Sequence, residues 1–167
     1  QGEYSNITGD LNSIQNIEFI DQNPIGKSSR SNPVTYVKAF DEIRDLYSRQ
    51  KLAQIRGYKP GFFSFNVQGG RCEDCEGEGT ITVGMQFMAD VHLECETCHG
   101  KRYKTETLDV QYRGKSIFDL LETSLEDALS FFSENPERLE SKILKKIQPL
   151  VDVGLGYLKL GQASSTM

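Results

Sequence analysis

Hydrophobic residues recur at three- and four-residue steps in two parts of the chain, which is the spacing of one face of an α-helix. Pro33 can open the first helix, and the apolar stripe that starts at Val37 predicts that it continues to about Ile55. Further stripes predict helices within residues 124–148, the first of them opened by a capping box at Thr123. The chain therefore has at least two helical regions, one on each side of its centre.

Alternating hydrophobic and polar positions lie between and before these helical regions. Residues 80–88 and 91–94 alternate well enough to predict a β-hairpin. Residues 16–20, 62–66 and 107–112 are short, apolar or aromatic, and predict single strands. Helices and strands together predict an α+β fold in which the hairpin is an insert.

All four cysteines of the sequence flank this hairpin as two Cys-x-x-Cys pairs, Cys72 with Cys75 and Cys95 with Cys98. Two such pairs at this separation can place four thiolates around one tetrahedral zinc ion. Glycines follow each pair and allow the chain to turn away from the metal. The spacing therefore predicts one structural zinc ion held by four cysteines.

Other interpretations of the cysteines are disulfides, four reduced thiols or a redox dithiol. Nothing else in the sequence suggests secretion, which disfavours disulfides, and a redox site needs only one Cys-x-x-Cys. His99 directly follows Cys98 and is a competing ligand, although four cysteines already complete a closed site.

Chain length, composition and charge set only loose limits on the number of domains, the location of the protein and its partners. A chain of 167 residues is enough for one domain, or for one domain with a small insert. The sequence has no signal-like start and no apolar run of membrane-spanning length, so we expect a cytoplasmic protein.

Residues 21–71 carry nine Lys or Arg against four Asp or Glu, within a chain of net charge −5. This basic block points weakly to a polyanionic partner, and a solvated surface is the alternative.

Several short motifs occur in the same order as in the UvrA family, which the chain therefore resembles. UvrA is the DNA-damage-recognition subunit of the bacterial excinuclease. They are Asp21-Gln-Asn-Pro-Ile-Gly, Arg30-Ser-Asn-Pro, Arg56-Gly-Tyr, Phe63-Ser-Phe-Asn, Gly69-Gly-Arg-Cys, the two cysteine pairs, Gly100-Lys-Arg-Tyr, Glu126-Asp-Ala and Asp152-Val-Gly-Leu-Gly-Tyr. The resemblance covers nearly the whole chain from about Ile17. It implies a dimeric ATPase of the ABC class that acts with UvrB in nucleotide excision repair of damaged duplex DNA.

The sequence departs from a complete protein of that family. It has no Gly-x-x-x-x-Gly-Lys-[Ser/Thr] loop, no Leu-Ser-Gly-Gly signature and no acidic Walker B strand. The resemblance therefore implies a helical fragment of the ABC-type signature domain. Residues 1–71 and 105–167 would belong to that domain, and residues 72–104 would form the inserted zinc module. We expect no ATP hydrolysis by this fragment alone, and ATP and magnesium to bind only in the parent protein.

The resemblance also suggests residues for binding. Gln22 resembles the glutamine of the ABC Q-loop, which senses the nucleotide, although an ordinary polar loop residue would look the same. A damage scanner should contact the DNA backbone rather than base edges, because lesions occur in any sequence. The candidate DNA-binding residues are Lys27, Arg30, Arg56, Lys59, Arg71, Lys101 and Arg102. The alternative for Arg71 and Arg102 is a structural or solvent-facing role beside the cysteine pairs.

Two other classes of function remain open from the sequence. Cys72 to Gly79 matches the Cys-x-x-Cys-x-Gly-x-Gly repeat of the DnaJ cysteine-rich region, which is a protein-interaction module. That region normally has four repeats, whereas this chain has two, and Arg102 replaces the last glycine of the second. The third class, an intact small enzyme, lacks an evident pairing of nucleophile and base. DNA binding that depends on salt would distinguish the first class from the second.

Overall fold

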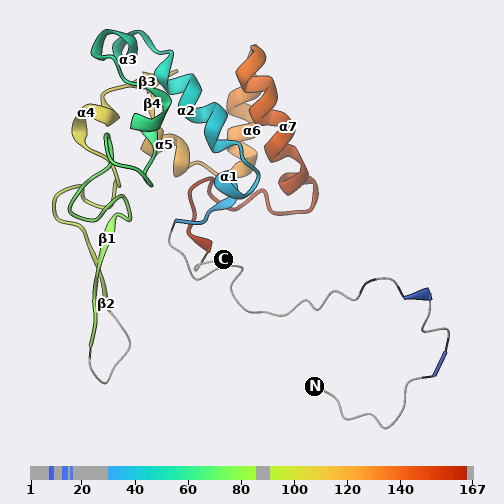
Figure 1. Ribbon diagram of the computed structural model, residues 1–167. Coiled ribbons are helices and arrows are strands. Elements are labelled where there is room, and N and C mark those ends of the chain that lie inside the picture. Colours follow the sequence, from blue (N-terminus) through green and yellow to red (C-terminus); the bar gives the residue numbers. More distant parts are fainter. Residues whose placement is uncertain (1–7, 10–12, 15, 17–29, 86–90, 165–167) are drawn as a thin grey trace.

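The computed structural model describes residues 8–9, 13–14, 16, 30–85 and 91–164. Helices form most of the described chain, and two small antiparallel sheets complete it (Figure 1). The α+β prediction is therefore confirmed. The strand predicted at residues 16–20 lies outside the described residues except for Asn16. No helix in the described part of the chain is both long enough and apolar enough to span a membrane.

The first helical region consists of three short helices rather than the single helix predicted over residues 33–55. They are α1 (Pro33–Tyr36), α2 (Phe40–Ser48) and α3 (Lys51–Arg56). The first break lies at Lys38, whose φ of 57° is left-handed and ends the helical path. Lys146 on a distant helix donates to the carbonyl oxygen of Lys38 at 2.7 Å and so stabilises this turn. A tertiary contact, which periodicity does not report, thus interrupts an otherwise continuous stripe.

The aromatic segment after α3 is also not the predicted strand. Pro60–Phe63 form a single 3₁₀ turn, η2, because Pro60 fixes the backbone at the first position of the turn. Phe63 and Phe65 are both completely buried, and the ring of Phe65 lies 5.0 Å from that of Phe40. The aromatic run therefore belongs to the core.

The predicted strand over residues 107–112 is only partly present, because its first two residues belong to a helical turn. Thr105–Leu108 form the helical turn α4, because the Thr107 hydroxyl is buried and donates to the Gly70 carbonyl at 2.8 Å. Only Gln111–Tyr112 form a strand, β3, which pairs with β4 (Lys115–Ser116) across a two-residue turn.

Three helices complete the chain: α5 (Ile117–Leu121), α6 (Leu125–Ser133) and α7 (Arg138–Asp152). Ser124, rather than the predicted Thr123, caps α6 by accepting a bond from the Asp127 amide at 3.1 Å. Helix α7 packs along α6 and against α2 (Figure 1). The core lies among these helices and includes Phe132, Ile143 and Ile147, each completely buried. We call residues 30–71 and 105–164 the helical body.

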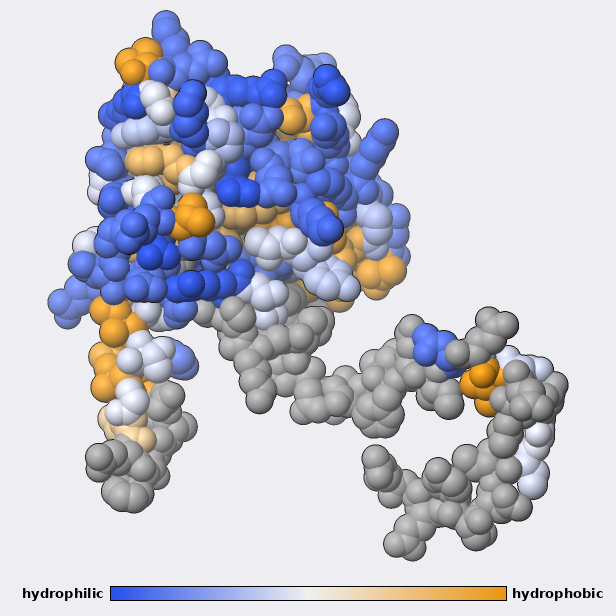
Figure 2. All heavy atoms as spheres, in the orientation of Figure 1, coloured by the Kyte–Doolittle hydropathy of each residue, from blue (hydrophilic) through white to orange (hydrophobic). Residues whose placement is uncertain are grey.

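The predicted β-hairpin is present and projects from the helical body (Figure 1). Strand β1 (Thr80–Val83) pairs with β2 (Val91–Glu94), with Ile81 opposite Leu93 and Val83 opposite Val91. These four side chains are between 38% and 53% exposed, and Figure 2 shows hydrophobic residues along this ribbon outside the body. The predicted turn at Ala89 and Asp90 lies outside the described residues. The ribbon is thus held at its base, where both strands lead into the cysteine pairs.

Candidate metal centre and nucleic-acid interface

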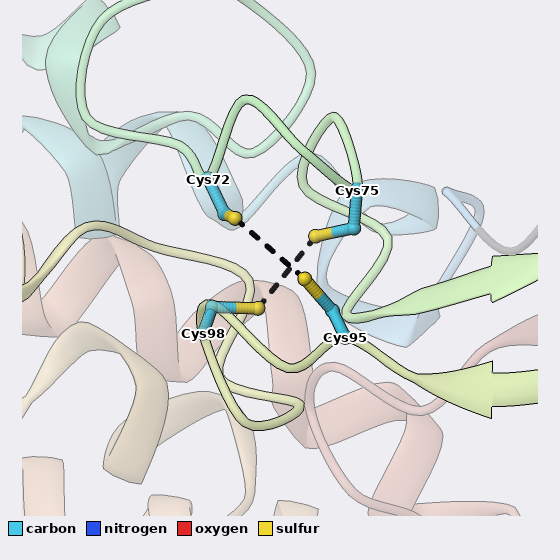
Figure 3. Close-up of side chains that lie close together, drawn as sticks. All are labelled: Cys72, Cys75, Cys95 and Cys98. Carbon is cyan, nitrogen blue, oxygen red and sulfur yellow. Dashed lines mark hydrogen bonds between the residues drawn. The ribbon is translucent and has the colours of Figure 1, made fainter.

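The four cysteine side chains point toward one another from two loops (Figure 3). The sulfur of Cys72 lies 3.9 Å from that of Cys95, and the sulfur of Cys75 lies 3.6 Å from that of Cys98. All four sulfurs lie within 4.8 Å of one another, and all four side chains are buried. A disulfide would need sulfurs about 2.0 Å apart, so this arrangement is not a pair of disulfides.

The cluster has the dimensions of a tetrahedral zinc site. A zinc–sulfur distance of about 2.3 Å places the corners of a tetrahedron about 3.8 Å apart. The two measured sulfur separations of 3.9 and 3.6 Å lie close to that value. The cluster offers four sulfur donors, which favour zinc over calcium or magnesium, since those ions prefer oxygen. The residues therefore fit one structural zinc ion.

Burial makes four thiolates costly in this cluster unless a cation is bound. Burial raises the pKa of the Cys75 thiol, although the Gly79 amide, which donates to its sulfur at 3.2 Å, lowers that pKa. Burial likewise raises the pKa of Cys98 well above its usual range. Four thiolates this close together repel one another in a buried site, and a divalent cation removes that cost. A bound zinc ion would supply positive charge and a cross-link between the two loops.

The two cysteine loops are related by an approximate internal twofold symmetry. The Cys95 amide donates to the Gly79 carbonyl at 3.0 Å, and the Cys72 amide donates to the Arg102 carbonyl at 2.9 Å. Gly79 and Arg102 occupy the same position in their loops, four residues after the second cysteine. Each loop therefore closes on the first cysteine of the other.

Both loops use left-handed backbone at matching positions after the second cysteine. Gly77 and Gly79 have φ values of 83° and 79°, and Gly100 and Arg102 have values of 72° and 67°. Arg102 thus adopts the conformation of the glycine that it replaces in the repeat, at some cost in strain. Its guanidinium lies 5.7 Å from the centre of the Phe65 ring, which gives it a cation–π contact with the body.

His99 lies outside the metal cluster. Among the described residues, the group that can surround one ion contains only the four cysteines. His99 instead lines a hollow of about 580 Å³ beside them, together with Lys101 and Lys104. Acidic side chains of Glu73 and Asp74 line the same hollow, so its charge is mixed.

Three of the candidate DNA-binding residues have internal partners. Arg30 lies 3.2 Å from Glu76 and 3.4 Å from Glu78, so it connects the helical body to the first cysteine loop. Arg56 contacts Asp109 at 2.9 Å and donates to the Glu106 carbonyl, and the hydrogen bond with Asp109 raises its pKa. The third residue with internal partners is Arg71.

Arg71 is the most enclosed of the candidates. Its side chain is 9% exposed, and its guanidinium lies 3.5 Å from Glu73 and 3.4 Å from the carbonyl of Asn66. These contacts give Arg71 a structural place between the body and the first loop. The acidic residues of that loop therefore act as partners for bases of this chain, and for Arg71 this is the structural role that the sequence left open as the alternative to DNA binding.

The other described candidates have no ion-pair partner in the part of the chain that the structure describes. Lys59 and Lys101 are exposed, and Arg102 is half-buried. Lys101 and Arg102 lie next to each other at the end of the second cysteine loop, where the metal would fix their backbone. Gln22 and Lys27 lie outside the described residues.

The fold and the cluster define an α+β protein with an inserted four-cysteine metal module, and the comparisons with known proteins name its relatives. The chain is 51% identical over 166 residues to UvrABC system protein A of Listeria monocytogenes and 53% identical to that of Clostridium perfringens. Each alignment covers 99% of this chain and 17% of the relative. No family model matches the chain.

A solved structure agrees with these sequence comparisons. The crystal structure of UvrA2 from Deinococcus radiodurans superposes with a TM-score of 0.81 at 46% identity, over 96% of this chain and 19% of that one. The chain is therefore a homologue of UvrA and corresponds to one segment of it, which confirms the resemblance found from the sequence motifs.

Proposed function

We propose that this chain is the zinc-containing, DNA-contacting part of a UvrA-like nucleotide excision repair protein. The observation that carries the proposal is the pairing of a four-sulfur cluster with two adjacent bases, Lys101 and Arg102, at the end of its second loop. One zinc ion would be held by Cys72, Cys75, Cys95 and Cys98 and would keep these bases in a fixed position.

The proposed organisation is a signature-domain fragment in two parts, residues 1–71 and 105–167, with the zinc module of residues 72–104 inserted between them. Two observations support it: the Val34 amide donates to the Leu160 carbonyl at 3.1 Å, and α2 packs against α7. Segments before and after the module therefore share one core.

Contacts to the DNA backbone would recognise damaged duplex regardless of its sequence. Lys59, Lys101 and Arg102 would neutralise phosphates directly, while Arg30 and Arg56 would first exchange their carboxylate partners for phosphate. In the parent protein we propose a second UvrA copy and a UvrB-like protein as partners. ATP and magnesium would bind to motifs that this sequence lacks, with Gln22 near the nucleotide, so this chain alone would not hydrolyse ATP.

The DnaJ-like alternative is not favoured. The identity to UvrA extends over 99% of the chain and so includes the helical body as well as the cysteine repeats. A shared zinc repeat alone would explain only residues 72–104.

The test is the binding of fluorescent duplex DNA at several salt concentrations. The variant Lys101→Gln/Arg102→Gln should bind all duplex sequences more weakly and lower the slope of log affinity against log salt by about two units, at about 0.9 for each lost phosphate contact. The control Arg49→Gln/Lys159→Gln removes the same charge from two bases that already pair with Asp45 and Glu122. An equal slope for variant and wild type, with zinc still bound, would refute the role of these bases.

A further inference from the structure

Helix α7 carries a row of three bases that the sequence patterns did not single out. Arg138, Lys142 and Lys145 follow one another at steps of four and three residues, so they share one face of the helix. All three are exposed, whereas Ile143 and Ile147 on the opposite face are buried in the core. We call these three bases the α7 stripe.

The bases of the stripe are not paired with nearby acids in the described part of the chain. None of its three bases forms an ion pair there, and the exposed Glu134 and Glu137 that precede α7 do not reach Arg138. The acids of α7 itself are used elsewhere: Glu140 is buried and accepts from the Tyr112 hydroxyl at 2.7 Å. Asp152, at the far end of the helix, accepts from Gln148 at 2.7 Å.

The neighbouring helix α2 does not neutralise the stripe either. Each of its acids already pairs with another base: Asp41 with Arg44, Glu42 with Lys146 at 2.6 Å, and Asp45 with Arg49 at 2.7 Å. The stripe is therefore a patch of concentrated positive charge within a chain whose net charge is −5.

This arrangement costs helix stability. Arg138 and Lys142 are like charges four residues apart on the helix, as are Lys142 and Lys146, and like charges at this spacing destabilise a helix. A polyanion would turn that cost into a favourable interaction, because one partner would neutralise the whole row.

We propose that the α7 stripe contacts the phosphate backbone of duplex DNA as a second surface, separate from the cysteine module. The inference rests on the proposed function. Arg138 and Lys145 are seven residues apart, about 10 Å along the helix axis, which matches the rise of about three base-pair steps of 3.4 Å along the duplex axis. Helix α7 lies on the side of the body away from the ribbon, so the two surfaces would hold the duplex at separate points (Figure 1).

The composition of the stripe favours DNA over an acidic protein. Protein interfaces are centred on buried aromatic or aliphatic anchors and are depleted in lysine. No large hydrophobic side chain is exposed between Arg138 and Lys145. The stripe offers charge without such an anchor, as a contact to the DNA backbone requires.

The test compares two double variants of the 167-residue chain, each of which removes two positive charges. Lys142→Gln/Lys145→Gln should lower the salt slope of duplex binding by about two units, and Arg49→Gln/Lys159→Gln should leave the slope unchanged. Circular dichroism should show full helix content for both, because all four side chains lie outside the core.

The outcomes separate this inference from the proposed function. Binding with the wild-type slope in Lys142→Gln/Lys145→Gln overturns the inference alone, even if Lys101→Gln/Arg102→Gln is defective. A reduced slope in Lys142→Gln/Lys145→Gln together with the wild-type slope in Lys101→Gln/Arg102→Gln supports the stripe and refutes the role of the bases in the cysteine module. Wild-type chain that does not bind duplex DNA at low salt overturns both.

Discussion

The helical body and the cysteine module of residues 72–104 are stabilised in different ways. The body has a continuous core of buried aliphatic and aromatic side chains from α1 to α7. Among the described residues of the module, the buried hydrophobic side chains are the four cysteines and Tyr103. Tyr103 itself packs in the core of the body and donates to the Phe63 carbonyl at 3.0 Å. The module thus has no apolar core apart from its metal cluster.

This difference implies that the two regions have separate sources of stability. Burial of apolar surface stabilises the body whether or not metal is present. The module has a ribbon with exposed strands, two loops with left-handed residues and a cluster of thiols, so a bound zinc ion would supply most of its folding free energy. The comparison leads to three predictions.

The largest effect is expected from Cys95→Ser, which removes one of the four zinc ligands. Structural zinc contributes about 10–16 kcal/mol of apparent binding free energy in small zinc peptides, so its loss should unfold the module. Wild-type chain should bind one zinc ion, measured by atomic absorption, and the variant should bind none. Hydrogen exchange should then become fast in residues 72–85 and 91–102 and remain slow in α6 and α7.

The matched control for this variant is Glu96→Ser, one residue further along the same loop. Glu96 is exposed and outside the cluster, so its replacement should keep the metal and the protection of the module. A helical circular dichroism signal that disappears entirely on chelation would contradict the separation of the two regions. A stoichiometry of two zinc ions would contradict the single site.

The second prediction concerns the body. Phe132 on α6 is completely buried, and its ring lies 6.4 Å from that of Tyr112 and 5.3 Å from that of Phe131. Phe132→Ala should lower the free energy of unfolding by about 3–5 kcal/mol, because it removes apolar contact and leaves a cavity. Urea denaturation followed by circular dichroism measures this loss. Chelator competition should show unchanged zinc affinity under native conditions, and a large fall in that affinity would mean that the body and the module fold as one unit.

The same difference explains what could be predicted from the sequence. The cysteine spacing predicted that four sulfurs would come together, because the geometry of such a cluster is local to two short loops, and the hairpin followed from the alternation of its residues. The helix boundaries failed where distant residues decide the local conformation. Lys146 holds the turn at Lys38, and Gly70 accepts the bond that makes residues around Thr107 helical.

The basic residues were harder to assign, because charge in a sequence carries no information about its partners. Arg30 lies 46 residues from Glu76 in the chain, and Arg56 lies 53 residues from Asp109, yet each pair is in contact. No spacing rule connects such pairs. The α7 stripe was overlooked for the opposite reason: its three bases follow helical spacing, but only the structure shows that none of them forms an ion pair in the described part of the chain and that the acids of α2 pair with other bases.

The smallest effect is expected from a pair of glycine substitutions that separates steric from conformational cost. Gly77 in the first cysteine loop and Gly114 in the β3–β4 turn have nearly equal φ values of 83° and 78°. A Cβ atom on Gly77 would lie 2.1 Å from the backbone oxygen of Phe65, whereas a Cβ on Gly114 meets nothing within 4 Å. Gly114→Ala should therefore cost only the left-handed strain, about 1–2 kcal/mol of unfolding free energy. Gly77→Ala carries the same strain and a clash with backbone that cannot move aside, which adds about 1–3 kcal/mol.

Because Gly77 follows Cys75 by two residues, this extra cost should appear as zinc affinity reduced about tenfold or more, measured by chelator competition, with the urea midpoint of the helices unchanged. Gly114→Ala should show the reverse, a lower urea midpoint and normal zinc affinity, since its turn belongs to the body. Equal effects of the two substitutions on both measurements would mean that the loop at Gly77 relaxes freely and that the module is less rigid than its hydrogen bonds suggest.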